Sequence, residues 1–343
     1  MSKHRPRLDV DALIFACDDI LINVQHSYRA VVQKTVQLYL EQALGLAPSK
    51  LPLLTLDEVL LLQKRGNFSD FWELAEALVM YFVEMLPPVP APTFPSKFHV
   101  PAIMAYLQFA GGNLRVSIDS LRQRKDIAQF AEGVVANGGG LEGANQALPR
   151  ENRHMLVSSG SVTKTNIVGR IFQELYLGAE QFEQAYRQPA VITHSSGYAE
   201  HESPVMDVEI LRAIGEKAAL AVVSSHPRTE VERSLRTAGL TGAFQVVITR
   251  NEMEQANGRP VPHPWPLLEA ARLLDPIPRR SAYVGANLGD VQAAKAANKT
   301  VPFLAIGCLA GAPDKDEMQA AFEQHKASMI LGHPDHLKEL MIG

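Results

Sequence analysis

The chain has 343 residues, of which 46% are hydrophobic and 20% are charged, and its 33 Lys+Arg against 37 Asp+Glu leave a formal net charge of -4. This composition is typical of a globular protein, and the mild acidity provides no overall attraction to nucleic acid or to an anionic membrane surface. We therefore expect neither a nucleic acid nor a membrane as a partner. At roughly 100–200 residues per domain, the length predicts two domains.

The two cysteines and the apolar runs indicate the compartment. Cys17 and Cys308 are the only cysteines and have no C-x-x-C spacing, a pattern that fits a reducing compartment without disulfides or a zinc site. The basic stretch Met1–Arg7 lacks the pattern of a signal peptide. No apolar run approaches the roughly 20 residues that span a bilayer. We expect a cytoplasmic protein.

The first apolar run, residues 11–17, has the length of a buried strand and ends in Asp18 and Asp19. A strand that ends in acidic residues suggests a site. Helical patterns then follow over about 27–46, 56–63 and 71–85, with apolar residues at helical spacing.

Two breaker segments divide this helical region. Residues 87–101 begin with five prolines in nine residues, which predicts an extended connector. The glycines of residues 137–143 predict a loop between a helix over about 120–136 and another that begins near Ser161.

From about residue 208 the pattern changes to strands that alternate with helices. The predicted strands are the apolar runs 219–223, 245–248, 281–285 and 302–306. Such alternation predicts βαβ units, that is, a three-layer Rossmann-like α/β domain with a parallel sheet between helices. The strand at 11–17 has no sheet of its own nearby, so we expect it to join this one. Residues 1–26 and 206–343 then form a discontinuous core, and 27–205 form an inserted, mainly helical cap.

Ligands of an open α/β sheet bind at the carboxyl ends of its strands, so the residues that follow each apolar run are the candidates for a site. They are Ala16 to Asp19, Ser224-Ser225, Arg259, and Ala286 to Asp290.

This set resembles the four motifs of the haloacid dehalogenase (HAD) superfamily, which are Asp-x-Asp, Ser/Thr, Lys and Gly-Asp-x-x-x-Asp. The stretches that make it similar to subfamily IA, the group with a helical cap, are Ile14 to Val24 with Ser27-Tyr-Arg29, Gly66 to Trp72, Phe172 to Gly178, and Tyr283 to Asp290. The resemblance covers nearly the whole chain and implies a phosphatase-like hydrolase.

The resemblance also implies a role for each motif. The first aspartate attacks phosphorus, and the second protonates the leaving group and then activates water. Mg²⁺ is the implied cofactor, held by the first aspartate, by a backbone carbonyl at the second and by an aspartate of the fourth motif. The lysine and the hydroxyl offset the charge of the phosphoryl oxygens.

The sequence departs from this pattern at two carboxylates. Ala16 stands at the nucleophile position, and Ala286 replaces the first acid of the fourth motif. Asp18 keeps the acid/base position and Ser224 the hydroxyl, while Arg259 replaces the lysine. The remaining calls are Asp290, with Asp18, as the residual metal ligands, and Asp19, Ser225, His226 and Asn287 as residues of the pocket.

These departures predict a HAD-like protein that is impaired as a phosphatase and that binds a small phosphorylated ligand or acts as a scaffold. The loss of two acids argues against Mg²⁺ binding. One alternative is an active Mg²⁺-dependent phosphohydrolase on a small phosphorylated metabolite that uses Asp18 and Asp290. A register with Asp18 as nucleophile would need an acid at position 20, which is Ile20. Another alternative is a subunit whose pocket is a relic and which binds a protein partner or a second copy of itself.

Overall fold

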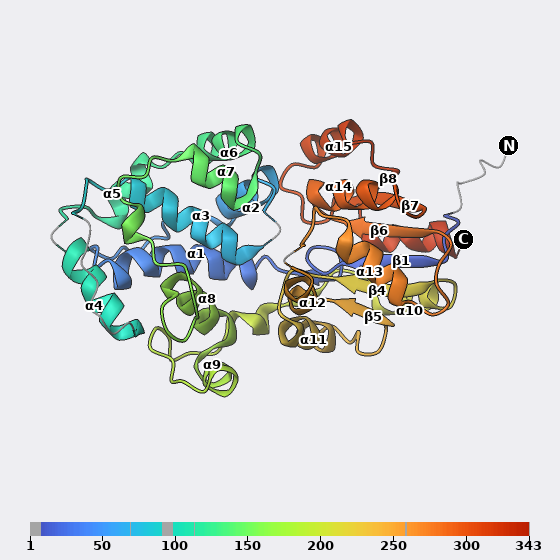
Figure 1. Cartoon of the computed structure of the whole chain (residues 1–343), viewed down its shortest axis with the longest axis horizontal. Coiled ribbons are helices and arrows are strands. Elements are labelled where there is room, and N and C mark those ends of the chain that lie inside the picture. The colour runs from blue at the N-terminus through green and yellow to red at the C-terminus, as the bar shows by residue number, and fades with distance from the viewer. Residues whose placement is uncertain (1–7, 69, 91–98, 113, 258, 343) are drawn as a thin grey trace. The chain divides into compact units, whose positions relative to one another are not determined.

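The computed structural model describes residues 8–68, 70–90, 99–112, 114–257 and 259–342. The chain divides into two compact units, one formed by Met1–Val24 with Glu202–Gly343 and the other by Gln25–His201. The first unit is an α/β unit and the second is helical (Figure 1). The chain thus leaves the α/β unit after its first strand and returns to it for the rest of the sheet.

The α/β unit is built on a six-stranded sheet in the order β5-β4-β1-β6-β7-β8. The strands are β1 Ala12–Ala16, β4 Ala219–Val223, β5 Val246–Ile248, β6 Ser281–Gly285, β7 Phe303–Cys308 and β8 Met329–Leu331. All five neighbouring pairs are parallel. The predicted α/β class with a Rossmann-like parallel sheet is therefore confirmed.

β1 lies in the middle of the sheet, between β4 and β6. All five of its residues are buried, as expected for a strand covered on both faces by helices. The prediction that this early strand joins the later ones is correct. A short antiparallel pair, β2 (Ile22–Asn23) with β3 (Ser203–Pro204), holds together the points where the chain leaves and re-enters the unit.

The helices of the α/β unit alternate with its strands (Figure 1). They are α10 Val208–Gly215, α11 Arg228–Thr237, α12 Arg250–Gln255, α13 Trp265–Leu273, α14 Leu288–Ala297, α15 Lys315–Gln324, the 3₁₀ turn Pro334–His336 and α16 Leu337–Met341. α13 contacts β1, β4 and β5, whereas α14 contacts β6 and β7. These helices shield the sheet and leave the residues beyond the strand ends to form the site.

The second unit is helical in every named element. Its elements are α1 Tyr28–Leu38, a π-helical extension Tyr39–Ala43, α2 Leu56–Arg65, α3 Phe71–Glu84, α4 Val100–Gly111, α5 Ile118–Arg124, α6 Ile127–Ala136, α7 Gly140–Ala147, Arg153–Met155, α8 Ile167–Leu177, α9 Ala179–Tyr186 and Tyr198–His201. The single helix expected over about 120–136 is two helices, because Asp126 caps α6 by accepting from the Gln129 N–H. The helix expected from Ser161 begins at Ile167, after the Asn166 cap.

The glycine-rich loop expected over 137–143 is wrong for its second half, since α7 begins at Gly140. The chain turns at Gly139, whose φ of +81° suits glycine, and the Gly140 N–H donates to the Gly66 carbonyl at 2.7 Å. This docking against Gly66 starts the helix despite the low helix propensity of glycine. Of the proline-rich segment, residues 91–98 lie outside the described residues, and Pro101 falls in the first turn of α4, where a missing N–H has no cost.

Three stretches of the family pattern meet at Tyr28 in the core of the helical unit. Its ring stacks on Tyr176 with centroids 4.2 Å apart and on Phe71 at 5.2 Å. Arg29, also buried, donates from Nε to Gln63 Oε1 at 2.7 Å. In this unit the motif residues therefore pack the core.

Candidate functional site at the carboxyl edge of the sheet

The ends of β1, β4 and β6 bring the predicted site residues together. Ala16 is paired with Val223, and Phe15 is paired with both Val222 and Val284. The residues that follow these strands, from Cys17, Ser224 and Ala286 onward, therefore leave the same edge of the sheet. Figure 1 shows β4, β1 and β6 running side by side toward this edge.

The two alanines lie at the centre of this edge. Ala16 is the last residue of β1 and Ala286 follows β6, and both are buried. Their methyl groups can neither attack phosphorus nor ligate a metal. The structure thus puts hydrocarbon at both positions where the family resemblance implies an acid.

Asp18 forms an ion pair with His226, across 208 residues of sequence. The His226 Nε2 atom lies 2.9 Å from Oδ2 and 3.0 Å from Oδ1 of Asp18. The imidazole is 5% exposed and the carboxylate 17% exposed. The turn after β4 holds the histidine in place, because its backbone N–H donates to Ser224 Oγ at 3.2 Å and its carbonyl accepts the Arg250 N–H at 3.0 Å.

The surroundings of His226 favour its charged form. Burial lowers the pKa of the imidazole, but the charge and hydrogen bond of Asp18 and the charge of Glu230 raise it, and Arg250 opposes them. The net effect is a pKa above the ordinary histidine value. The pair is therefore an imidazolium beside a carboxylate over a wider pH range than an isolated histidine would allow.

Asp19 is buried and has a φ of +61°, in the left-handed region. Its N–H donates to the Ile22 carbonyl at 2.8 Å. Its side chain lies against Gly311, where an added Cβ would be 2.7 Å from the Asp19 Cγ. Asp19 thus shapes the turn after β1, and Gly311 gives its carboxylate room.

Asp290 is fixed by three hydrogen bonds. Tyr283 Oη donates to Oδ1 at 3.0 Å, and the N–H groups of Ala286 and Asn287 donate to Oδ2 at 3.0 and 2.9 Å. This is the carboxylate half of a capping box at the start of α14, with Asn287 as the N-cap. Gly285 permits the close approach, since an added Cβ there would lie 2.2 Å from the Asp290 Cβ.

Arg259 and Ser225 complete the predicted set. Arg259 is exposed, in contrast to the buried residues of the edge. Ser225 is half-buried, and its carbonyl accepts from Arg250 Nε at 2.8 Å. Arg250, which follows β5 directly, is the basic residue that the structure brings against the Ser225–His226 turn. The strand-end rule would have found it, had it been applied to the run 245–248.

Two further residues of this region were missed in the sequence. Tyr283 lies inside β6, and its burial, together with Asp290, raises the pKa of its hydroxyl well above the usual value, so that it remains a donor. Burial, and after it the charges of Asp18 and Glu202, raise the pKa of the Cys17 thiol. A protonated, buried Cys17 is not an activated nucleophile.

The side chains of this edge do not fit a Mg²⁺ ion. Mg²⁺ requires near-octahedral oxygen ligands, for which the family supplies carboxylates at the positions of Ala16 and Ala286. The remaining acids are engaged, Asp18 by His226 and Asp290 by Tyr283 and two amides. Within the described ranges, no group of three or more His, Cys, Asp or Glu side chains is arranged to hold a metal ion.

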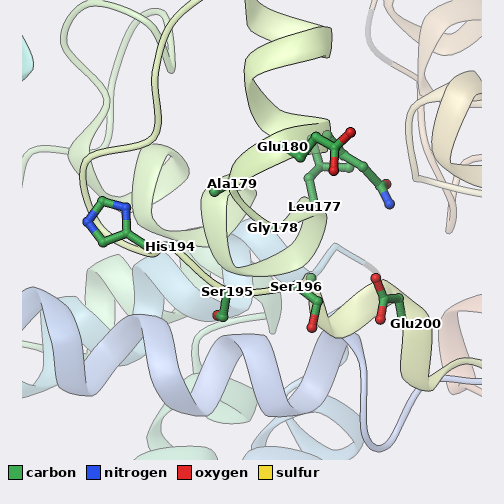
Figure 2. A pocket seen from close by; sticks show the side chains of 10 residues that line it. Leu177, Gly178, Ala179, Glu180, His194, Ser195, Ser196 and Glu200 are labelled. Carbon is green, nitrogen blue, oxygen red and sulfur yellow. The ribbon is translucent and has the colours of Figure 1, made fainter.

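A pocket of about 280 Å³ lies apart from this edge, within the helical unit, around the turn between α8 and α9. Figure 2 shows Ser195 and Ser196 beneath the turn, with His194 well away from Glu180 and Glu200. Gly178, with φ +78°, makes the turn possible. Because its charged side chains do not converge, this pocket lacks the arrangement of a catalytic site.

Comparison with known proteins matches residues 175–304 to the haloacid dehalogenase-like hydrolases. Pyrophosphatase PpaX of Bacillus mycoides is 32% identical over 123 residues, which are 36% of this chain and 54% of that protein. PpaX of Bacillus anthracis is 32% identical over 112 residues, 33% of this chain and 49% of that protein. The chain spans about half the length of the curated relatives it matches.

Two solved structures share the fold at low sequence identity. A putative phosphoglycolate phosphatase from Lactobacillus delbrueckii subsp. bulgaricus aligns with a TM-score of 0.54 and 14% identity, over 98% of this chain and 100% of that one. An X-ray structure from a structural-genomics programme aligns with a TM-score of 0.58 and 17% identity, over 96% and 98% of the two chains.

The parallel sheet, the motif order at its carboxyl edge and these matches define a Rossmann-like fold of the hydrolase type. The chain belongs to the haloacid dehalogenase-like superfamily. Within the residues that the structure describes, no helix is long and apolar enough to cross a membrane.

Proposed function

We propose that this chain is a HAD-like protein that does not carry out phosphoryl-aspartate catalysis and that binds a small phosphorylated ligand at the carboxyl edge of its sheet. The observation that carries the proposal is the pair of features at the end of β1. Ala16 stands at the nucleophile position, and the Asp18 carboxylate is held by His226 at 2.9 Å.

Loss of the nucleophile argues against turnover by the family mechanism. A methyl group at position 16 cannot form the covalent intermediate, and removal of a covalent nucleophile costs on the order of 10⁶ in kcat in the protease example. The nearest other carboxylate, Asp18, carries its charge against an imidazolium. An acid/base group held in this way is poorly placed to exchange a proton with a leaving group.

Retention of phosphate-binding groups supports ligand binding. Ser224 is buried at the end of β4, and its oxygen accepts the His226 N–H, which leaves the hydroxyl hydrogen for a phosphoryl oxygen. His226 contributes positive charge at the same turn, and Arg250 follows the neighbouring strand. Hydroxyl and cationic donors of this kind are suited to an anionic ligand.

A turnover assay tests the loss of catalysis. We expect the natural chain to hydrolyse p-nitrophenyl phosphate with Mg²⁺ no faster than background, and the double variant Ala16→Asp/Ala286→Asp to show measurable turnover. Ala320→Asp, which places an acid on the exposed face of α15, is the matched control. Turnover by the natural chain that Asp18→Asn abolishes would establish the alternative, an active phosphohydrolase that uses Asp18 and Asp290.

Calorimetry with inorganic phosphate tests the binding half of the proposal. We expect saturable binding that Ser224→Ala weakens by about tenfold, equal to the loss of about 1.4 kcal/mol of binding free energy. Ser234, whose hydroxyl is bonded to Glu202 at 2.5 Å, provides the control Ser234→Ala. Absence of phosphate binding in a folded natural chain would refute this half.

A cytoplasmic location is part of the proposal. Both cysteines are buried, free thiols, which agrees with a reducing compartment.

A further inference from the structure

We infer that the carboxyl edge of this sheet is a metal-independent site, in which the ring of His226 replaces the divalent cation of the family as the partner of Asp18. The inference goes beyond the loss of catalysis, because a chain without the nucleophile could still bind Mg²⁺ through its other acids. It concerns which cation neutralises the carboxylate at the end of β1.

The first support is the geometry of Asp18. One nitrogen, His226 Nε2, lies within 3.0 Å of both carboxylate oxygens. The nitrogen therefore faces the open side of the carboxylate, the side on which a metal ion would bind. With the imidazole 5% exposed and tied to Ser224 and Arg250 through its backbone, the ring cannot swing aside without breaking the turn after β4.

The second support is the capping role of Asp290. Its Oδ2 accepts the N–H groups of Ala286 and Asn287, and its Oδ1 accepts the Tyr283 hydroxyl. These three donors use much of the lone-pair capacity of the carboxylate. Rotation toward an ion would leave buried donors without a partner at the start of α14.

The third support is the chemistry of positions 16 and 286. Alanine at both removes the oxygen ligands that would complete an octahedral shell around an ion between the strand ends. The charge of the remaining carboxylate is offset instead by a side chain of the protein. The three observations come from three different strand ends, those of β1, β4 and β6, and agree.

Mn²⁺ binding, followed by water-proton relaxation, tests the inference without reference to activity. We expect the full natural chain to bind no Mn²⁺ at the sheet edge, even at millimolar ion. We expect the variant Ala16→Asp/Ala286→Asp/His226→Asn, which supplies two acids and removes the competing ring, to bind Mn²⁺ about tenfold or more tightly than the natural chain. The control Ala320→Asp/His194→Asn makes the same kinds of change at exposed positions.

Two results would overturn the inference. One is Mn²⁺ binding by the natural chain that Asp18→Asn or Asp290→Asn removes while Asp9→Asn, at an exposed site, does not. The other is a folded triple variant that binds no more Mn²⁺ than the natural chain, since these three residues would then not decide metal binding. Metal binding without phosphatase turnover would overturn this inference and leave the proposed loss of catalysis standing, so the two can fail separately.

Discussion

Tyr283 donates its hydroxyl hydrogen to Asp290 Oδ1 at 3.0 Å, and the two residues stand on either side of the turn from β6 into α14. The same carboxylate accepts two backbone N–H groups. Asp290 is the last acid of the family's fourth motif that this chain retains, and its bonds are those of a helix cap. The retention of this acid therefore has a structural explanation that does not depend on a metal.

Tyr283→Phe tests that explanation. The variant removes the only side-chain donor printed for the Asp290 carboxylate among the described residues, and we expect the free energy of unfolding to fall by about 1.5–3 kcal/mol, the range for a hydrogen bond to a charged group. Urea denaturation monitored by circular dichroism measures the change. Tyr198→Phe, at a half-buried ring beside His201, should change stability by much less. Equal losses in the two variants would contradict the proposed role of the Tyr283 hydroxyl.

The Asp18–His226 pair makes stability depend on pH. The pKa of His226 is raised in the folded protein, whereas it is about 6.5 in an unfolded chain. The pair's contribution is therefore fully present below about pH 6.5 and is lost as the pH rises through the higher folded pKa. We expect the stability difference between the natural chain and Asp18→Asn, about 1.5–3 kcal/mol at pH 6, to shrink steadily toward pH 9.

NMR titration of the His226 ring checks the sign of this effect. With the carboxylate removed in Asp18→Asn, burial and Arg250 would dominate, and only Glu230 would oppose them. The pKa of His226 should then fall. A His226 pKa that is the same in both proteins would show that Asp18 does not set its charge.

The strands were predictable from the sequence because each is a short apolar run. Five of the six sheet strands coincide with such runs to within a residue or two. The sixth, β8, was missed because Met329–Leu331 has three residues, only one of which is buried. The helical breaks were harder to predict, because a docked backbone contact, such as that of Gly140 with Gly66, decides where α7 begins.

The composition of the site was predictable, but its pairings were not. Asp18 and His226 both follow strands, which places them at one edge of the sheet, yet nothing in the sequence indicates that they face each other. Position 259 matched the family lysine by order in the chain, whereas the structure brings Arg250 to the Ser225–His226 turn. Side-chain partners across a sheet edge depend on loop conformation, which short sequence patterns do not specify.

Arg170 and Glu174 form a buried ion pair on α8 that anchors the segment after α9. The two side chains are 3% and 0% exposed, and Glu174 Oε2 also accepts the N–H groups of Val191 and Ile192 at 2.8 and 2.6 Å. We expect Arg170→Met to lower the free energy of unfolding by about 3–5 kcal/mol, because it leaves a buried carboxylate without its cation. Arg212→Met, which breaks an exposed pair with Glu209, should cost only about 0–1 kcal/mol.

Limited proteolysis separates a local from a global effect of Arg170→Met. Arg170 also donates to Gln188 and to the Pro189 carbonyl, at 3.0 and 2.5 Å. Cleavage within residues 187–193 should therefore become faster in the variant, relative to cleavage elsewhere. An unchanged cleavage pattern would mean that the Glu174 hydrogen bonds alone hold this segment.

Gly285 gives a test of how tightly β6 packs on the Asp290 cap. A methyl group there would lie 2.2 Å from the Asp290 Cβ, in a buried region where neither backbone can retreat. We expect Gly285→Ala to lower the free energy of unfolding by about 1–3 kcal/mol through overpacking. Gly133→Ala is the matched change, since its Cβ would meet only the Ala147 Cβ at 3.4 Å within helix α6. Because alanine favours a helix over glycine, this control should raise stability by about 0.5–1 kcal/mol. If urea denaturation showed Gly285→Ala to be neutral, the cap would not constrain the end of β6, and Asp290 would have room to turn toward a ligand.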